Sequence, residues 1–169
     1  MTALNVGDNF PEGVSFTYIP YTPEKKDIGA CGIPIKYDAS KEFKNKKVVL
    51  VAVPGAFTPT CQEQHVISYI RNEDKLKARG VDQVVIIASN DAFVMSAWGK
   101  ANQVTGDFII FAADDGLKFS KSIGWANPDG DRALRYALVI DHGKVTYAAR
   151  DDVRGSIENT GAEGVLAKL

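Results

Sequence analysis

The sequence contains only two cysteines among its 169 residues, and it has no long hydrophobic run. Two cysteines are too few for the disulfide framework of a small secreted domain, although they could form one bridge or include one nucleophile. The longest clear apolar run, residues 48–53, is far shorter than the roughly 20 residues that span a membrane. The N-terminal segment MTALNVGDNF lacks the basic and apolar regions of a secretory signal. We therefore expect a soluble protein inside the cell, where most thiols stay reduced.

An excess of charge of one sign is also missing. The chain has 20 Lys and Arg residues against 21 Asp and Glu residues, and its formal net charge is −1. This balance argues against a protein that binds nucleic acid through a basic face. The hydrophobic share of 45% is ordinary for a globular protein and suffices for one core. The length fits a single domain over residues 1–169.

Apolar strands alternate with amphipathic helices along the chain. Unbroken Val, Leu and Ile runs predict strands buried on both faces. We expect strands at residues 14–20, 47–53, 81–89, 108–112, 134–140 and 144–149. We expect helices at residues 62–79 with a break near Asn72, at 91–103 capped by Asn90 or Asp91, at 117–123, and at 157–168 opened by Ser156. This order predicts an α/β domain with a mixed central sheet flanked by helices and an N-terminal strand extension, and its ββα ending is typical of the thioredoxin-like fold.

The stretch PGAFTPTC, which ends at Cys61, joins a buried strand to the next helix. Functional sites of α/β sheets collect at the carboxyl ends of strands. Thr58 followed by Pro59 suits a helix N-cap with proline at the first helical position, whereas Thr60 with Glu63 forms a competing capping box. In both registers Cys61 lies in the first helical turn, where unpaired backbone N–H groups and the helix dipole stabilise a thiolate. We therefore predict a reactive Cys61 rather than a merely buried one.

A histidine, His65, follows Cys61 at a spacing that puts both residues on one helix face. The two could form a catalytic pair or two metal ligands, or His65 could cover the pocket wall. A zinc site needs three or four ligands, and the remaining candidates, Cys31 and His142, lie far away in sequence. We therefore predict no metal site, and we expect His142 to be exposed in a hairpin turn.

These residues resemble the active-site motif of the peroxiredoxins. The motif Pro-x-x-x-Thr-x-x-Cys matches Pro54, Thr58 and Cys61, and the run from Val53 is similar to the type-five, or alkyl hydroperoxide reductase, subfamily of yeast and filamentous fungi. The resemblance covers nearly the whole chain. It continues at residues 93–100 (FVMSAWGK), 119–124 (FSKSIG) and 135–140 (RYALVI). It implies a thioredoxin-like fold and a thiol peroxidase that reduces hydrogen peroxide and alkyl hydroperoxides without a metal, haem, flavin or nicotinamide cofactor.

The resemblance also implies a role for each residue of the motif. Cys61 corresponds to the peroxidatic cysteine, whose thiolate attacks a peroxide oxygen and becomes a sulfenic acid. Thr58 would hydrogen-bond the thiolate and the incoming oxygen, and Pro54 would help to exclude water. Arg135 corresponds to the catalytic arginine, which stabilises the thiolate and the leaving oxygen. The plainer alternatives are that Thr58 only caps the helix and that Arg135 only pairs with an acid such as Asp131.

Three neighbouring residues complete the candidate set. Arg132 is a rival guanidinium close to Arg135 in sequence, but it does not match the family position. His65 and Phe57 are expected to line the pocket.

The second cysteine, Cys31, lies in a stretch rich in glycine and proline and is expected on a loop. Similar fungal peroxiredoxins use a cysteine in this loop across a dimer. The resemblance thus implies a homodimer in which Cys61 and Cys31 form an intersubunit disulfide, which thioredoxin or a glutathione and glutaredoxin system would reduce. The alternatives are an intrachain bridge, an incidental Cys31 in a one-cysteine enzyme, and a redox sensor that passes its disulfide to a partner.

The chain ends in Ala167-Lys168-Leu169. This tripeptide resembles the Ser-Lys-Leu peroxisomal address, although a helix could also end this way by chance. We therefore expect a cytoplasmic protein, a peroxisomal protein, or one found in both places.

Overall fold

A seven-stranded mixed sheet organises the protein, and the computed structural model describes residues 3–169 of it. The strands are β1 (Phe16–Tyr18), β2 (Ile35–Tyr37), β3 (Lys47–Ala52), β4 (Gln83–Ala88), β5 (Ile109–Ala113), β6 (Tyr136–Asp141) and β7 (Lys144–Arg150). Their order across the sheet is β2-β1-β5-β4-β3-β6-β7. Strand β4 pairs in parallel with β3 and β5, and all other pairs are antiparallel. The α/β class and the mixed sheet are therefore as predicted.

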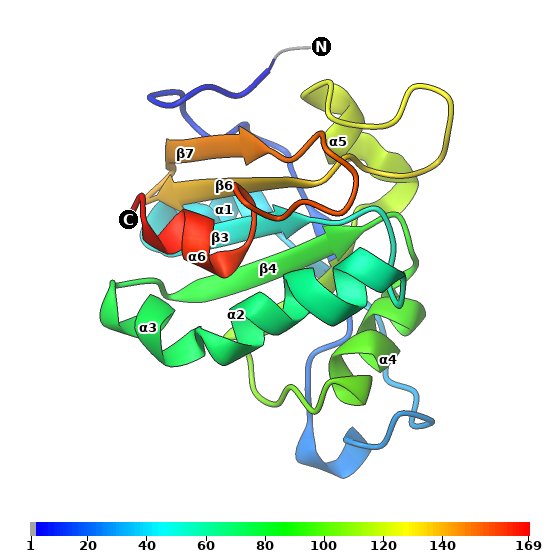
Figure 1. The fold of residues 1–169 in the computed structure, drawn as a ribbon. Helices are drawn as coiled ribbons and strands as arrows, with labels where there is room; N and C mark the ends of the chain where they lie inside the picture. The colour runs from blue at the N-terminus through cyan, green and yellow to red at the C-terminus, as the bar shows by residue number, and fades with distance from the viewer. Residues whose placement is uncertain (1–2) are drawn as a thin grey trace.

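Helices cover both faces of this sheet. They are α1 (Ala39–Glu42), α2 (Ile67–Arg71), α3 (Glu73–Ala78), α4 (Ala92–Ala101), α5 (Lys118–Ser122) and α6 (Ala162–Leu166). Figure 1 shows α2 and α6 in front of the sheet and α1 behind it. Within residues 3–169, none of these helices is both long enough and apolar enough to cross a membrane.

The position of strand β3 in the sheet explains why apolar and polar residues do not alternate along it. Val48 and Leu50 belong to the apolar cluster on one face of the sheet, and Val49 and Val51 belong to the cluster on the other face. All four are buried. Because successive side chains of a strand point to opposite faces, an unbroken apolar run is what a strand covered on both sides requires.

Most of the expected helices and strands are present in the structure. One strand was not expected, and the first long helix is divided. Strand β2 was not expected, because its three residues, IKY, give no apolar run; it pairs with β1 at the edge of the sheet. The expected helix 62–79 is divided into a π-helix and the helices α2 and α3, with the predicted break at Asn72, whose side chain donates to Ser68 O at 2.8 Å. Of the two caps considered for α4, Asp91 is the one that accepts from the Val94 N–H.

The prediction for the closing helix is wrong. Helix α6 begins at Ala162 with Gly161 as its N-cap, instead of opening at Ser156. The cause is the carboxylate of Asp151, which accepts hydrogen bonds from the backbone N–H groups of Asn159 and Thr160. These bonds hold the preceding residues in turns, so the helix starts only after them.

Candidate active site

The segment that carries Cys61 begins where β3 ends. Pro59 is the first helical residue, as predicted, and the Gln62 N–H donates to Thr58 O at 2.8 Å. The hydroxyl of Thr58 donates to Gly55 O at 2.7 Å, so it closes the preceding turn and does not cap the helix. The competing capping box is wrong, because Thr60 is already helical, with φ −63° and ψ −39°, and its side chain makes no capping bond.

Cys61 opens a π-helix that runs to Val66. In a π-helix the hydrogen bonds run from residue i to residue i+5, and such turns are frequent at functional sites. His65 therefore still lies about one turn from Cys61. Both side chains are almost completely buried, with 1% of Cys61 and 0% of His65 exposed.

Arg135 joins these two side chains. Its Nη2 lies 3.4 Å from Cys61 Sγ, and its Nη1 lies 2.8 Å from His65 Nδ1. The sheet explains this placement, because β6 is antiparallel to β3 and pairs Tyr136 with Ala52. The residue before β6 must therefore lie beside the carboxyl end of β3, where the Cys61 segment begins. The structure thus brings Cys61, Arg135 and His65 together.

The hydrogen bonds of His65 define its tautomer. A guanidinium can only donate, so Nδ1 of His65 is the acceptor, and Nε2 carries the proton that it donates to Thr160 O at 2.9 Å. Burial is the main cause that lowers the pKa of His65 to about 4, and the charge of Arg135 acts in the same direction. His65 is therefore neutral at pH 7. It holds the guanidinium in place and has no nitrogen left for the thiol.

The C-terminal part of the chain completes this arrangement. Thr160 O also accepts from the Tyr69 hydroxyl at 2.6 Å, and the Asp151 carboxylate accepts from the Thr160 N–H at 2.8 Å and from its hydroxyl at 2.7 Å. Partial burial acts to raise the pKa of Asp151, but the hydrogen bonds from Thr160 and Asn159 lower it below its usual value. Sequence reasoning missed these residues, because they meet the site only through the fold.

Some of the predicted residues line an open groove of about 900 Å³. Pro54 and Thr58 line it together with Arg135, whereas Phe57 and His65 do not, which differs from the expectation for those two. The ring of Phe57 lies near that of Trp98, with 6.3 Å between the ring centroids, and His65 is buried in contact with Arg135.

The structure also decides between Arg135 and Arg132, and it tests the alternative pairing of Arg135 with Asp131. The rival arginine, Arg132, reaches Pro54 O at 3.4 Å and does not contact the thiol. Among the described residues, Arg135 forms no ion pair with Asp131. Arg135 is therefore the guanidinium at Cys61.

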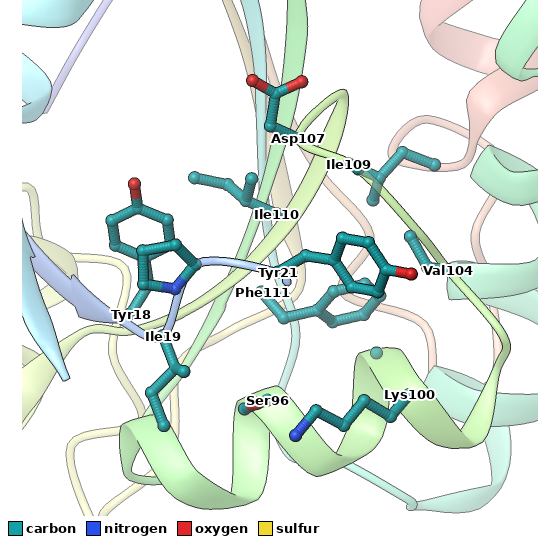
Figure 2. Close-up of a pocket in the computed structure, with 13 residues that line it drawn as sticks. Tyr18, Ile19, Tyr21, Ser96, Lys100, Val104, Asp107, Ile109, Ile110 and Phe111 are labelled. Atoms are coloured by element: carbon teal, nitrogen blue, oxygen red, sulfur yellow. The ribbon is translucent and has the colours of Figure 1, made fainter. Parts of the chain in front are cut away.

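Cys31 lies on an exposed loop, as expected, and both cysteines are free thiols. Two lysines hold the backbone of this loop: Lys25 Nζ donates to Cys31 O at 2.9 Å, and Lys100 Nζ donates to Ala30 O at 2.6 Å. Lys100 also lines a cavity of about 230 Å³ between α4 and β5, and Tyr21 and Phe111 belong to the same lining (Figure 2). This cavity shares no lining residue with the groove at Arg135.

Comparison with known proteins identifies the family of this chain. The Redoxin family model matches residues 5–166. Peroxiredoxin Pen c 3 of Penicillium citrinum is 58% identical over 99% of this chain and 99% of its own length. A protein of Lipomyces kononenkoae, provisionally named a peroxisomal peroxiredoxin, is 48% identical over 96% of this chain and 99% of its own.

A solved structure supports the same assignment. The reduced Prx3 of Vibrio vulnificus in complex with hydrogen peroxide has a TM-score of 0.80 and 38% sequence identity, over 97% of this chain and 98% of its own. This likeness confirms the predicted thioredoxin-like fold. The chain belongs to the Redoxin family and is, within it, a peroxiredoxin, a peroxidase of the oxidoreductase class.

Proposed function

We propose that Cys61 is the nucleophile with which this chain reduces hydrogen peroxide and alkyl hydroperoxides. The contact of 3.4 Å between Arg135 Nη2 and Cys61 Sγ carries the proposal, because a fixed guanidinium stabilises a thiolate. The thiolate attacks the terminal oxygen of the hydroperoxide. An S–O bond forms and the O–O bond breaks, so the sulfur is oxidised to a sulfenic acid. The peroxide is reduced to an alkoxide or hydroxide, which takes a proton from water.

The other residues of the site act on this step. Arg135 stabilises the charge that develops on the leaving oxygen, and His65 holds Arg135 through Nδ1. The Thr58 hydroxyl already donates to Gly55 O, so its lone pairs are open to the O–H of an incoming peroxide. Pro54 lines the groove beside it and shields the sulfenic acid from water.

The sulfenic acid is resolved by Cys31 of a second copy in a homodimer. Two observations support this step: Cys31 is exposed, and it carries a free thiol. Its sulfur attacks the sulfenic sulfur of Cys61, an S–S bond forms, and water leaves. Thioredoxin, or glutathione with glutaredoxin, then reduces the disulfide by thiol–disulfide exchange.

Peroxide consumption by the wild type, Cys61→Ser and Cys31→Ser, measured with thioredoxin and with glutathione and glutaredoxin as reductants, tests these steps. We expect peroxide consumption by the wild type to be catalytic with at least one reductant and to disappear in Cys61→Ser. On a non-reducing gel after peroxide treatment, we expect a disulfide-linked dimer for the wild type and none for Cys31→Ser. A dimer that survives in Cys31→Ser would exclude Cys31 as the resolving residue. Consumption of only one peroxide per subunit with every reductant would instead favour a redox sensor.

Import into peroxisomes is a further part of the proposal. The C-terminal Ala167-Lys168-Leu169 resembles the peroxisomal address, and one similar protein carries a peroxisomal name. We expect an N-terminal fluorescent fusion, which leaves this end free, to co-localise with peroxisomes. The same fusion without the final three residues should stay in the cytoplasm, and equal distributions of the two would refute import through this signal.

A further inference from the structure

The groove lined by Arg135, the residue that contacts Cys61, is far larger than hydrogen peroxide requires. It holds about 900 Å³, whereas a molecule with two heavy atoms fills about 60 Å³ if each takes the volume of one water. Three loops form it: the Cys61 segment, the loop before β6 and the loop after β7. The room beyond the thiol is therefore available to the rest of a larger hydroperoxide.

Two guanidinium groups in this groove, those of Arg132 and Arg154, have no carboxylate partner among residues 3–169. The two acids of the groove are already engaged. Asp152 pairs with Arg150 at 3.1 Å, and Asp151 holds the turn before α6. The groove thus presents unneutralised positive charge, although the whole chain has a formal net charge of −1.

Arg132 lies directly on the active-site loop. Its guanidinium covers Gly55 so closely that a Cβ at that position would overlap Nη1. Its one hydrogen bond in the structure is the 3.4 Å contact to Pro54 O, at the long limit for such a bond. Because a guanidinium has five N–H donors in a planar fork, Arg132 keeps free donors that match the two oxygens of a carboxylate.

The wall of this groove is partly apolar. Pro54, Pro59, Leu134 and Val153 line it, and 75% of the Val153 surface is exposed. An exposed valine and two prolines in one wall offer contact to a hydrocarbon chain. The groove therefore combines an apolar wall and a carboxylate-binding fork with Arg135, whose Nη2 contacts the sulfur of Cys61.

We propose that this groove selects hydroperoxides that carry a carboxylate on a hydrocarbon chain, with Arg132 as the carboxylate-binding residue and Arg154 in support. The inference rests on the proposed function, because the hydroperoxide group must reach Cys61 while the carboxylate meets Arg132. The chemical step is unchanged: the terminal oxygen goes to sulfur, and the product is the corresponding hydroxy acid. Substrates without a negative charge lose the arginine contact and react more slowly.

A matched pair of substrates tests this selection. The rate constant for oxidation of Cys61 is measured in single turnover, without any thiol reductant, for a hydroperoxy alkanoic acid and for its methyl ester. We expect the wild type to favour the acid by about fivefold at low salt, the upper range for a partly exposed ion pair. Arg132→Gln should bring the ratio of acid to ester close to unity. Arg71→Gln removes an exposed arginine outside the groove, so it should keep the wild-type ratio.

The ratio within one variant cancels changes in folding or in the thiol itself. A wild-type ratio near unity would overturn the proposal, as would a preference for the acid that persists in Arg132→Gln. Glutathione also carries carboxylates. A wild-type ratio near unity, together with a higher KM for glutathione in Arg132→Gln, would assign the site to the reductant and reject the substrate proposal. Failure of the proposed function would look different, because Cys61→Ser would then still consume hydrogen peroxide.

Discussion

Acidification should destabilise the protein through His65. Its ring is 0% exposed, and burial lowers the pKa of His65 from 6.5 to about 4. Between these pH values the unfolded chain binds a proton that the folded protein excludes, so stability falls as the pH falls. The stability from neutral His65 is complete above about pH 6.5, and the pKa difference makes its loss at pH 4 roughly 3 kcal/mol.

A variant that cannot titrate isolates this contribution. Asn at position 65 keeps an acceptor for Arg135, and Thr160 O keeps its hydrogen bond from Tyr69. We expect urea denaturation, followed by circular dichroism, to show a larger loss of unfolding free energy between pH 7 and pH 4 in the wild type than in His65→Asn. The difference between the two losses should be roughly 3 kcal/mol.

The other histidine provides the matched control. His142 lies exposed in the turn of the β6–β7 hairpin with φ +48°, a conformation that Asn also adopts readily. His142→Asn leaves the buried ring of His65 in place, so the loss of stability between pH 7 and pH 4 that arises from His65 should persist in this variant. If the wild type and His65→Asn lose stability in parallel, the buried neutral ring is not the source of the acid sensitivity.

Two further variants test the site and the packing. In Arg135→Lys, a single ammonium cannot contact both Cys61 and His65 as the guanidinium does. We therefore expect the rate constant for the reaction with hydrogen peroxide, measured by competition kinetics, to fall about 100-fold. An unchanged rate constant would contradict the role of the guanidinium. In Gly99→Ala, the new Cβ would lie 2.7 Å from Cδ1 of Phe111, so we expect urea denaturation to show a loss of about 1–3 kcal/mol. A more stable variant would mean that helix propensity outweighs this overlap.

The sequence predicts the strand and the helix start that carry Cys61, because both depend on local chemistry. The VVLVA run predicts β3 through its burial on both faces, and the Thr58-Pro59 pair predicts where the helix begins. The contact of Arg135 with Cys61 could be predicted only through the family motif. No local pattern contains it, because it depends on the pairing of β6 with β3.

The contacts that hold Arg135 in place could not be predicted either, because they too join residues that are distant in sequence. His65 meets Thr160 O across 95 positions of sequence, and the turn that presents Thr160 depends on the distant carboxylate of Asp151. The helical pattern of residues 157–168 therefore predicted a longer helix, since amphipathic spacing does not reveal a carboxylate that competes for its backbone N–H groups.

The dependence of the site on Thr160 also sets the order in which it can form during synthesis. The ribosome makes Cys61 long before Arg135 and Thr160, which supply its guanidinium and the anchor of His65. At about 5–20 residues per second, the nascent chain carries the thiol for roughly 5–20 s before Thr160 is added. During that interval Cys61 has no guanidinium held beside it by His65 and Thr160. The contacts that surround the sulfur in the folded protein thus form only when the fold is complete.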